Sequence, residues 1–173
     1  MKITKPIQYL LVGLPFSGKT TLALELKKRL NFASINVDKL KWSMGYRDVG
    51  DDEVPDKVWK DIFRQADQLI VKYLREGKNL ASEYAWVTKS WRDRARDVAG
   101  RAGFTTKIIY LKIPIAEIKR RLAENRRLKN HFIWPEKELN NYIKDFEEPG
   151  DDEDVIIYDQ TILLDRWITE NII

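Results

Sequence analysis

A phosphate-binding motif lies near the start of the chain. The segment Gly13-Leu-Pro-Phe-Ser-Gly18-Lys19-Thr20 matches the pattern G-x-x-x-x-G-K-[ST] without a gap. Glycines let such a loop turn its N–H groups toward phosphate oxygens, and the dipole of the following helix adds to the attraction. Lys19 can then reach the β- and γ-phosphates, and the Thr20 hydroxyl can ligate Mg²⁺. The motif predicts a P-loop for ATP and Mg²⁺ made of Gly13, Pro15, Phe16, Ser17, Gly18, Lys19, Thr20 and Thr21.

An acidic residue, Asp38, directly follows the second apolar segment, 33–37. At the carboxyl end of a strand this carboxylate would lie beside the γ-phosphate, where it could accept a hydroxyl proton or orient Mg²⁺ through water. The competing interpretation is a helix N-cap for residues 39–42, a common use of Asp. Position and charge together favour the catalytic interpretation.

A cluster of arginines follows the fourth apolar segment. It comprises Arg120, Arg121, Arg126 and Arg127. Arginine suits the task of spreading charge over a phosphoryl group in transit, although a solvated helix end beside the dipole is the alternative. We expect Arg121 and Arg126 to be functional and leave the roles of the other two open.

The region that should bind a phosphate acceptor is rich in aromatic residues. Trp42, Tyr84 and Trp86 follow strand ends and could stack on a base, a sugar or an aromatic drug, whereas Trp59 and Trp91 have the spacing of core residues. Lys41 could bind an anionic acceptor or could be a surface lysine. The acidic segment 48–56 would repel phosphates, which favours a small hydroxylated acceptor over a polynucleotide.

Apolar segments and helical periodicities alternate along the chain. The patterns predict strands at 7–12, 33–37, 79–83, 106–113 and 155–158, and helices at 18–30, 55–77, 89–102, 114–125, 135–146 and 163–171. Such alternation is typical of βαβ units, so we expect an α/β fold: a five-stranded parallel sheet with helices on both faces, in a single domain over 1–173. Ligands of such sheets bind beyond the carboxyl ends of the strands.

The composition excludes several classes of protein. The 173 residues contain no Cys and one His (His131), which excludes disulfide scaffolds, zinc ribbons and most His-based metal sites. No apolar run approaches the roughly 18 residues of a membrane span, and no signal-peptide pattern opens the chain. We therefore expect a cytoplasmic protein without a membrane partner. The net charge of +4 is compatible with phosphorylated ligands or nucleic acid, and the oligomeric state stays open.

Three classes of P-loop protein compete: a phosphotransferase, a GTP-dependent switch, and a mechanical or assembly ATPase. A GTP-dependent switch would need a guanine-reading N-K-x-D run, which the sequence lacks. The favoured class is a kinase that transfers the γ-phosphate of ATP to a hydroxyl of a nucleoside, sugar or antibiotic. The alternatives are a kinase of polynucleotide 5′-hydroxyls or DNA bases, and a regulatory or assembly ATPase without a small-molecule acceptor.

The pattern also resembles a known group of enzymes. The P-loop, the pair Asp38-x-x-Lys41, Glu83 followed by Arg92, and Pro114 followed by Arg121 resemble the small P-loop kinases, within them the polynucleotide-kinase-like, zeta-toxin-like and chloramphenicol-phosphotransferase-like group. The resemblance implies the three-layer P-loop NTPase fold of nucleoside-monophosphate kinases, with a lid at about 120–135. It implies catalytic roles for Lys19, Asp38, Arg121 and Arg126, acceptor contacts from Lys41, Trp42, Glu83, Tyr84 and Arg92, and a metal site at Thr20, Asp38 and Glu83.

Overall fold

A parallel sheet forms the centre of the molecule. The structure is a computed structural model that describes residues 5–47, 49–84, 86–128 and 135–173. Its strands are β1 (Ile7–Val12), β2 (Ala33–Asn36), β3 (Leu80–Glu83), β4 (Thr105–Leu111) and β5 (Val155–Tyr158). They pair in parallel in the order β2-β3-β1-β4-β5. The predicted five-stranded α/β sheet is confirmed.

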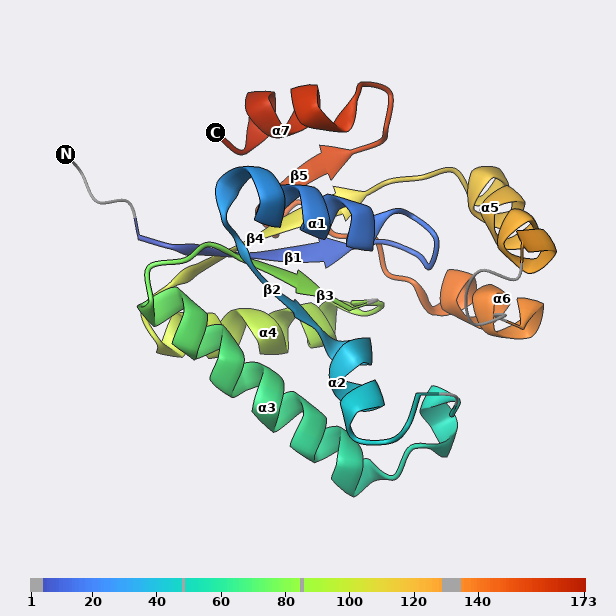
Figure 1. Cartoon of the computed structure of the whole chain (residues 1–173), viewed down its shortest axis with the longest axis horizontal. Helices are drawn as coiled ribbons and strands as arrows, with labels where there is room; N and C mark the ends of the chain where they lie inside the picture. The colour runs from blue at the N-terminus through green and yellow to red at the C-terminus, as the bar shows by residue number, and fades with distance from the viewer. Residues whose placement is uncertain (1–4, 48, 85, 129–134) are drawn as a thin grey trace.

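Four helices cover the two faces of the sheet (Figure 1). α1 (Lys19–Leu30) and α7 (Leu164–Asn171) lie on one face, and α3 (Asp56–Arg75) and α4 (Lys89–Arg101) lie on the other. Successive strand residues point to opposite faces, so Leu11 packs in the α1 cluster while Leu10 packs in the α4 cluster. Both leucines are fully buried. Burial on both faces explains why β1 is a continuous apolar run.

The remaining helices lie at the carboxyl edge of the sheet. These are α2 (Val37–Ser43), α5 (Ile115–Leu128) and α6 (Glu136–Asp145), and a 3₁₀ turn, η1 (Asp51–Glu53), lies in the loop between α2 and α3. Asn36 and Leu11 both stand opposite Glu83 in the register, so β1, β2 and β3 end at one level. In the described ranges, no helix combines the length and the apolar character needed to cross a bilayer.

Two boundaries differ from the predicted ones in ways that matter for the site. β2 ends at Asn36, one residue earlier than expected, because the Asn36 side chain accepts a hydrogen bond from the Lys39 amide and begins α2 there. β4 ends at Leu111 instead of residue 113, and α5 continues to Leu128. The chain therefore leaves β4 earlier and carries its arginines on a longer helix than the periodicity indicated.

Candidate active site

Two glycines shape the loop between β1 and α1. Gly18 has a φ of +100°, a left-handed conformation that costs little only without a Cβ. A Cβ on Gly13 would lie 2.8 Å from the Ser17 Oγ and 3.0 Å from the Leu111 carbonyl oxygen, so a side chain does not fit there. Gly18 is also the N-cap of α1, which has no side-chain cap and no acidic residue in its first turn. The first-turn amides of α1 are therefore available to an anion.

Lys19 folds back over this loop. Its Nζ donates to the carbonyl oxygens of Gly13 at 2.8 Å and Leu14 at 2.9 Å. Burial lowers the pKa of Lys19 to about 8, and the nearby carboxylates of Asp38 and Glu83 oppose this shift. The ammonium group thus lies within electrostatic reach of both predicted site carboxylates. Thr20 and Thr21 follow it in the first turn of α1 and are exposed.

The outer side of the loop is held by Arg121 of α5. Its Nη1 donates to the Phe16 carbonyl oxygen at 3.0 Å, its Nη2 to the Gln160 Oε1 at 2.6 Å, and its Nε to the Glu117 Oε1 at 2.7 Å. Gln160, in turn, donates from its Nε2 to the Ser17 carbonyl oxygen at 2.9 Å. All three guanidinium nitrogens of Arg121 are engaged, so in this structure Arg121 braces the P-loop.

Asp38 lies in the first turn of α2, directly beyond the end of β2. Asn36 supplies the N-cap, so the capping interpretation of Asp38 is wrong. The Asp38 carboxylate is therefore not needed to cap α2. Burial raises the pKa of Asp38, the charge of Asp51 adds to the rise, and Lys19 and Lys41 oppose it. A carboxylate with a raised pKa, close to the P-loop lysine, is suited to accept a proton.

Glu83 ends β3 as a buried carboxylate. It accepts hydrogen bonds from the Ser34 Oγ and the Asn36 Nδ2, both at 3.1 Å, which fix its orientation toward β2. Within the described ranges no group of three or more His, Cys, Asp or Glu side chains could hold a metal ion by itself. Mg²⁺ keeps several waters and needs only one or two protein oxygens besides phosphate. The Thr20 hydroxyl and the carboxylates of Asp38 and Glu83, both within electrostatic reach of Lys19, are oxygen ligands of the kind that Mg²⁺ prefers.

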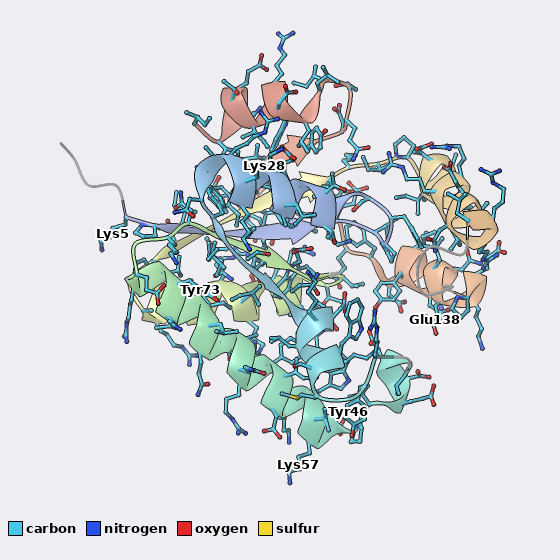
Figure 2. The ribbon with its side chains drawn as sticks, viewed as in Figure 1. Lys5, Lys28, Tyr46, Lys57, Tyr73 and Glu138 are labelled. Carbon is cyan, nitrogen blue, oxygen red and sulfur yellow. The ribbon has the colours of Figure 1, made fainter. Side chains whose placement is uncertain are left out.

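On the far side of Asp38, the loop between α2 and α3 is fastened to two helices. The Asp51 carboxylate accepts from the Lys41 Nζ at 2.8 Å and from the Tyr142 hydroxyl of α6 at 3.1 Å. Lys41 also donates to the Val49 carbonyl oxygen and is buried. Figure 2 shows Glu138 of α6 on the side of this loop, and burial together with Asp51 and Asp52 raises the pKa of Glu138. The surroundings of Asp51 are therefore negatively charged.

The aromatic residues divide between surface and core. Trp42 is 40% exposed, and the Arg47 guanidinium carbon lies 5.2 Å from the centre of its ring. Tyr84 is half-buried, and burial, with Asp51 and Asp38, raises its pKa. Trp86, an expected pocket residue, is 2% exposed and donates from its indole to the Ser82 carbonyl oxygen. Trp91, an expected core residue, is 37% exposed but stacks on Phe63. The expectations for Trp86 and Trp91 were wrong.

Arg92 does not contact the acceptor side as expected. It is fully buried and makes a two-pronged ion pair with Glu153, at 2.9 Å from both its Nε and its Nη2. Its Nη1 donates to the carbonyl oxygens of Trp86 and Glu147. A guanidinium without solvent access has no free donor to offer a ligand. Arg92 instead ties α4 to the segment before β5.

Arg126 lies near the end of α5, with its Nη1 3.6 Å from a carboxylate oxygen of Glu136 on α6. This places it within the predicted lid, at about 120–135, and in the last turn of α5. Residues 129–134, which belong to that lid and include His131 and Trp134, lie outside the described residues.

A cavity of about 510 Å³ lies at the end of β4, beneath α5 and α6. Leu14 of the P-loop contributes to its wall, but neither Lys19 nor Asp38 does. Its lining is largely apolar and includes Tyr110 and Phe146, whose ring centres lie 5.9 Å apart. The cavity therefore lies apart from the predicted reacting groups.

Four residues of the site were not among the site residues predicted from the sequence. Glu117 acts through Arg121, whereas Gln160 contacts both Arg121 and the Ser17 carbonyl oxygen. Asp51 accepts from Lys41 and from Tyr142. Gln160 follows β5, a strand end at the ligand edge, and that position alone could have marked it. The others lie in a loop or on helix surfaces, where acidic and aromatic residues are common.

Comparison with known proteins gives a family match and several relatives. A family model described as an AAA domain (AAA_33) matches residues 9–149. Shikimate kinase from Clostridium botulinum (strain Loch Maree / Type A3) is 29% identical over 115 residues, which are 66% of this chain and 64% of that protein. The shikimate kinase of strain ATCC 19397 / Type A is 29% identical over 114 residues, again 66% and 64%. The chain thus spans somewhat less than two thirds of the length of these relatives.

Solved structures share the fold over nearly the whole chain. A sugar kinase from Janibacter sp. HTCC2649 superimposes with a TM-score of 0.71 and 16% identity, covering 95% of this chain and 91% of that one. The APS kinase of Mycobacterium tuberculosis in complex with AMPPNP and APS superimposes with a TM-score of 0.66 and 16% identity, covering 96% of this chain and 95% of that one. A gluconokinase from Sinorhizobium meliloti 1021 superimposes with a TM-score of 0.64 and 17% identity, covering 96% of this chain and 89% of that one. These likenesses establish the P-loop NTPase fold of kinases.

Proposed function

The chain belongs to the AAA domain family matched over residues 9–149, and we propose that it is an ATP- and Mg²⁺-dependent kinase of a small hydroxylated acceptor. The observation that carries the proposal is the proximity of two groups. The Lys19 ammonium on the P-loop and the half-buried Asp38 carboxylate in the first turn of α2 are close enough for each to shift the pKa of the other. One grips phosphate and the other accepts a proton, which are the two tasks of phosphoryl transfer.

In the proposed reaction the acceptor hydroxyl gives its proton to Asp38 while its oxygen attacks the γ-phosphorus. The bond between that phosphorus and the β–γ bridging oxygen breaks, and ADP leaves with the bonding electron pair. The amides of the P-loop and Lys19 hold the β- and γ-phosphates in line. Arg126 spreads the charge of the phosphoryl group in transit, with the segment 120–135 as its lid. Thr20, with Asp38 and Glu83, would hold Mg²⁺, which would neutralise phosphate charge.

A small acceptor is favoured by the relatives and by the charge of the site. The similar proteins include enzymes described as shikimate kinase, sugar kinase and gluconokinase. In this chain, Asp51, Asp52 and Glu53 form η1 beside Asp38. A polynucleotide backbone would have to approach this turn and would be repelled.

We further infer that the acceptor carries no anionic group near the reacting hydroxyl. Lys41, the cation expected to bind an anionic acceptor, is buried and paired with Asp51. Arg92, the second such cation, is buried against Glu153. Pairing cancels most of the attraction that either side chain could offer to a carboxylate or phosphate. A neutral sugar, nucleoside or related alcohol fits this environment.

The proposal predicts transfer of γ-labelled phosphate from ATP to one member of a panel of nucleosides, sugars, antibiotics and oligonucleotides. Asp38→Asn should slow that transfer by about 10²–10⁴-fold, because it removes the proton acceptor and leaves the P-loop intact. Asp61→Asn, on the outer surface of α3, is the matched control and should leave the rate unchanged. Product label is counted after chromatography.

Two results would contradict the proposal. Label released only as inorganic phosphate, with every acceptor inert, would favour the ATPase alternative. Label on oligonucleotides alone, with steep loss at higher salt, would favour the polynucleotide kinase.

Acceptor charge can be tested with a matched series: one neutral sugar, the corresponding sugar acid and the corresponding amino sugar. The wild type should use the acid least well. Asp51→Asn should release the Lys41 ammonium and raise kcat/KM for the acid relative to the neutral sugar, by roughly tenfold if one charge pair is exchanged. A wild-type enzyme that prefers the acid would overturn the inference about charge while leaving kinase activity in place.

A further inference from the structure

The backbone carbonyls of two consecutive P-loop residues are held from outside the loop. The Phe16 carbonyl oxygen accepts from the Arg121 Nη1 at 3.0 Å, and the Ser17 carbonyl oxygen from the Gln160 Nε2 at 2.9 Å. A loop that points its amides at phosphate must point its carbonyls elsewhere, and those carbonyls need donors. The donors come from α5 and from the turn after β5, which are distant in sequence.

Gln160 is held in place by its neighbours and by an unusual backbone. Its φ is +63°, a left-handed conformation that a residue with a side chain adopts at a cost. The preceding Asp159 accepts from both the amide and the hydroxyl of Thr161, at 3.0 Å and 2.7 Å, which closes a tight turn around Gln160. The turn aims the Gln160 amide at the P-loop. Gly18 permits this close approach, since a Cβ there would lie 3.0 Å from the Gln160 Nε2.

Only an amide satisfies both partners at this position. The Gln160 Nε2 donates to Ser17, while the Gln160 Oε1 accepts from the Arg121 Nη2 at 2.6 Å. A carboxylate could accept from Arg121 but could not donate to the Ser17 carbonyl, and an ammonium could do only the reverse. Arg121 is itself oriented by Glu117, at 2.7 Å. The chain Glu117–Arg121–Gln160 thus links α5 to the P-loop.

We propose that Gln160 is a positioning residue for nucleotide binding: it holds the Ser17 carbonyl turned out of the phosphate site and joins the P-loop to α5 through Arg121. This inference rests on the proposed function only in taking the P-loop ligand to be ATP. It does not depend on any acceptor. It also gives Arg121 a role in the loop's shape in addition to the predicted role in the lid.

The test separates the two hydrogen bonds of Gln160. Gln160→Glu keeps the acceptor for Arg121 and removes the donor to Ser17, whereas Gln160→Ala removes both. Binding of a non-hydrolysable ATP analogue is measured by calorimetry, and the thermal midpoint by circular dichroism. Both variants should weaken analogue binding by roughly tenfold, because a misaligned P-loop loses amide–phosphate bonds. Gln65→Ala, on the exposed side of α3, is the control and should bind as the wild type does.

A second measurement tests the link to α5. If Gln160 and Arg121 act as one unit, the loss of affinity in the double variant Arg121→Ala with Gln160→Ala should be clearly smaller than the product of the two single losses. In the same variants the KM for ATP should rise while the KM for the acceptor stays constant. A purely structural role would instead lower the thermal midpoint and leave analogue affinity unchanged in the folded protein.

The outcomes keep this inference apart from the proposed function. Wild-type affinity in both Gln160 variants overturns the inference and leaves kinase activity untouched. Analogue binding that depends on Gln160, in a protein that phosphorylates no acceptor, supports the inference and overturns the kinase. A wild-type protein that binds no nucleotide overturns both.

Discussion

At the scale of single residues, the charges of Lys19 and Asp38 each shift the pKa of the other. Burial pushes the pKa of Lys19 down and that of Asp38 up, and the opposite charge of each moderates the shift of the other. A bound triphosphate would add negative charge near Lys19 and would favour its ammonium form. The raised pKa makes the Asp38 carboxylate a better proton acceptor than an ordinary carboxylate, which suits it to the proposed catalytic role.

Arg126 is the residue expected to act on the transition state. Arg126→Ala should lower kcat by roughly 10²-fold with a smaller effect on ATP affinity, because charge stabilisation at the moving phosphoryl group is lost. Arg127→Ala, its exposed neighbour, is the matched control. Steady-state kinetics with ATP varied at saturating acceptor measure both quantities. A rise in the KM for ATP at constant kcat would assign Arg126 to ground-state binding instead.

At the scale of the elements, the buried ion pair of Arg92 with Glu153 joins α4 to the turn before β5. Removing one member of a buried pair leaves an uncompensated charge, so Arg92→Met should lower the free energy of unfolding by about 3 kcal/mol. The double variant Arg92→Met with Glu153→Leu should recover part of that loss. Urea denaturation followed by circular dichroism measures both values.

Two checks accompany this prediction. Arg101→Ala, whose side chain is 85% exposed on the same helix, should change the free energy of unfolding by less than about 0.5 kcal/mol. The folded Arg92→Met protein should keep its acceptor KM, since Arg92 is fully buried. A raised acceptor KM with little loss of stability would restore the contact predicted from the sequence.

The first turns of α5 give a prediction about acid. Hydrogen bonds from Arg120 and then Arg121 lower the pKa of Glu117 from 4.5 to about 2. A carboxyl whose pKa is lower in the folded state stabilises the fold above its unfolded pKa, and this contribution disappears as the pH falls through the folded value. Glu117→Gln should therefore flatten the decline of stability between about pH 4.5 and about pH 2. Urea denaturation at several pH values across that window measures the free energy of unfolding. Asp97→Asn on α4, where the carboxylate is exposed, is the control.

At the scale of the whole molecule, the sequence predicted the sheet well and the side-chain network poorly. The apolar runs, the P-loop glycines and Pro114 are local signals. They predict the positions of the strands along the chain, the start of α1 and the start of α5. α2 was weighed only as an alternative, with Asp38 as its cap, because a helix of 7 residues is short and its actual cap is Asn36. Helices this short carry little periodicity.

Pairings between distant segments could not be predicted in the same way. Arg92 and Glu153 are 61 residues apart, and nothing in either neighbourhood indicates that the pair is buried. Trp86 follows β3, as a pocket residue would, but a φ of +49° turns the chain and its ring packs under the sheet. The partners of Asp51 and Gln160 are set by three-dimensional contacts, although the place of Gln160 after β5 follows from the strand pattern. The predicted places of Lys19 and Asp38 at the ligand edge, by contrast, follow from strand polarity alone.

The level ends of β1, β2 and β3 constrain how this protein can change. Asn36, Glu83 and Leu11 stand in one row across the sheet. Deleting one residue from β3 would flip Glu83 to the opposite face and break its bonds to Ser34 and Asn36. The loop between α2 and α3 lies outside the sheet, so an insertion there would leave the strand register unchanged, provided that it spares the hydrogen bonds of Val49 and Asp51 with Lys41 and Tyr142. Diversification toward new acceptors should therefore proceed by lengthening that loop, while strand lengths remain constant among descendants that keep activity.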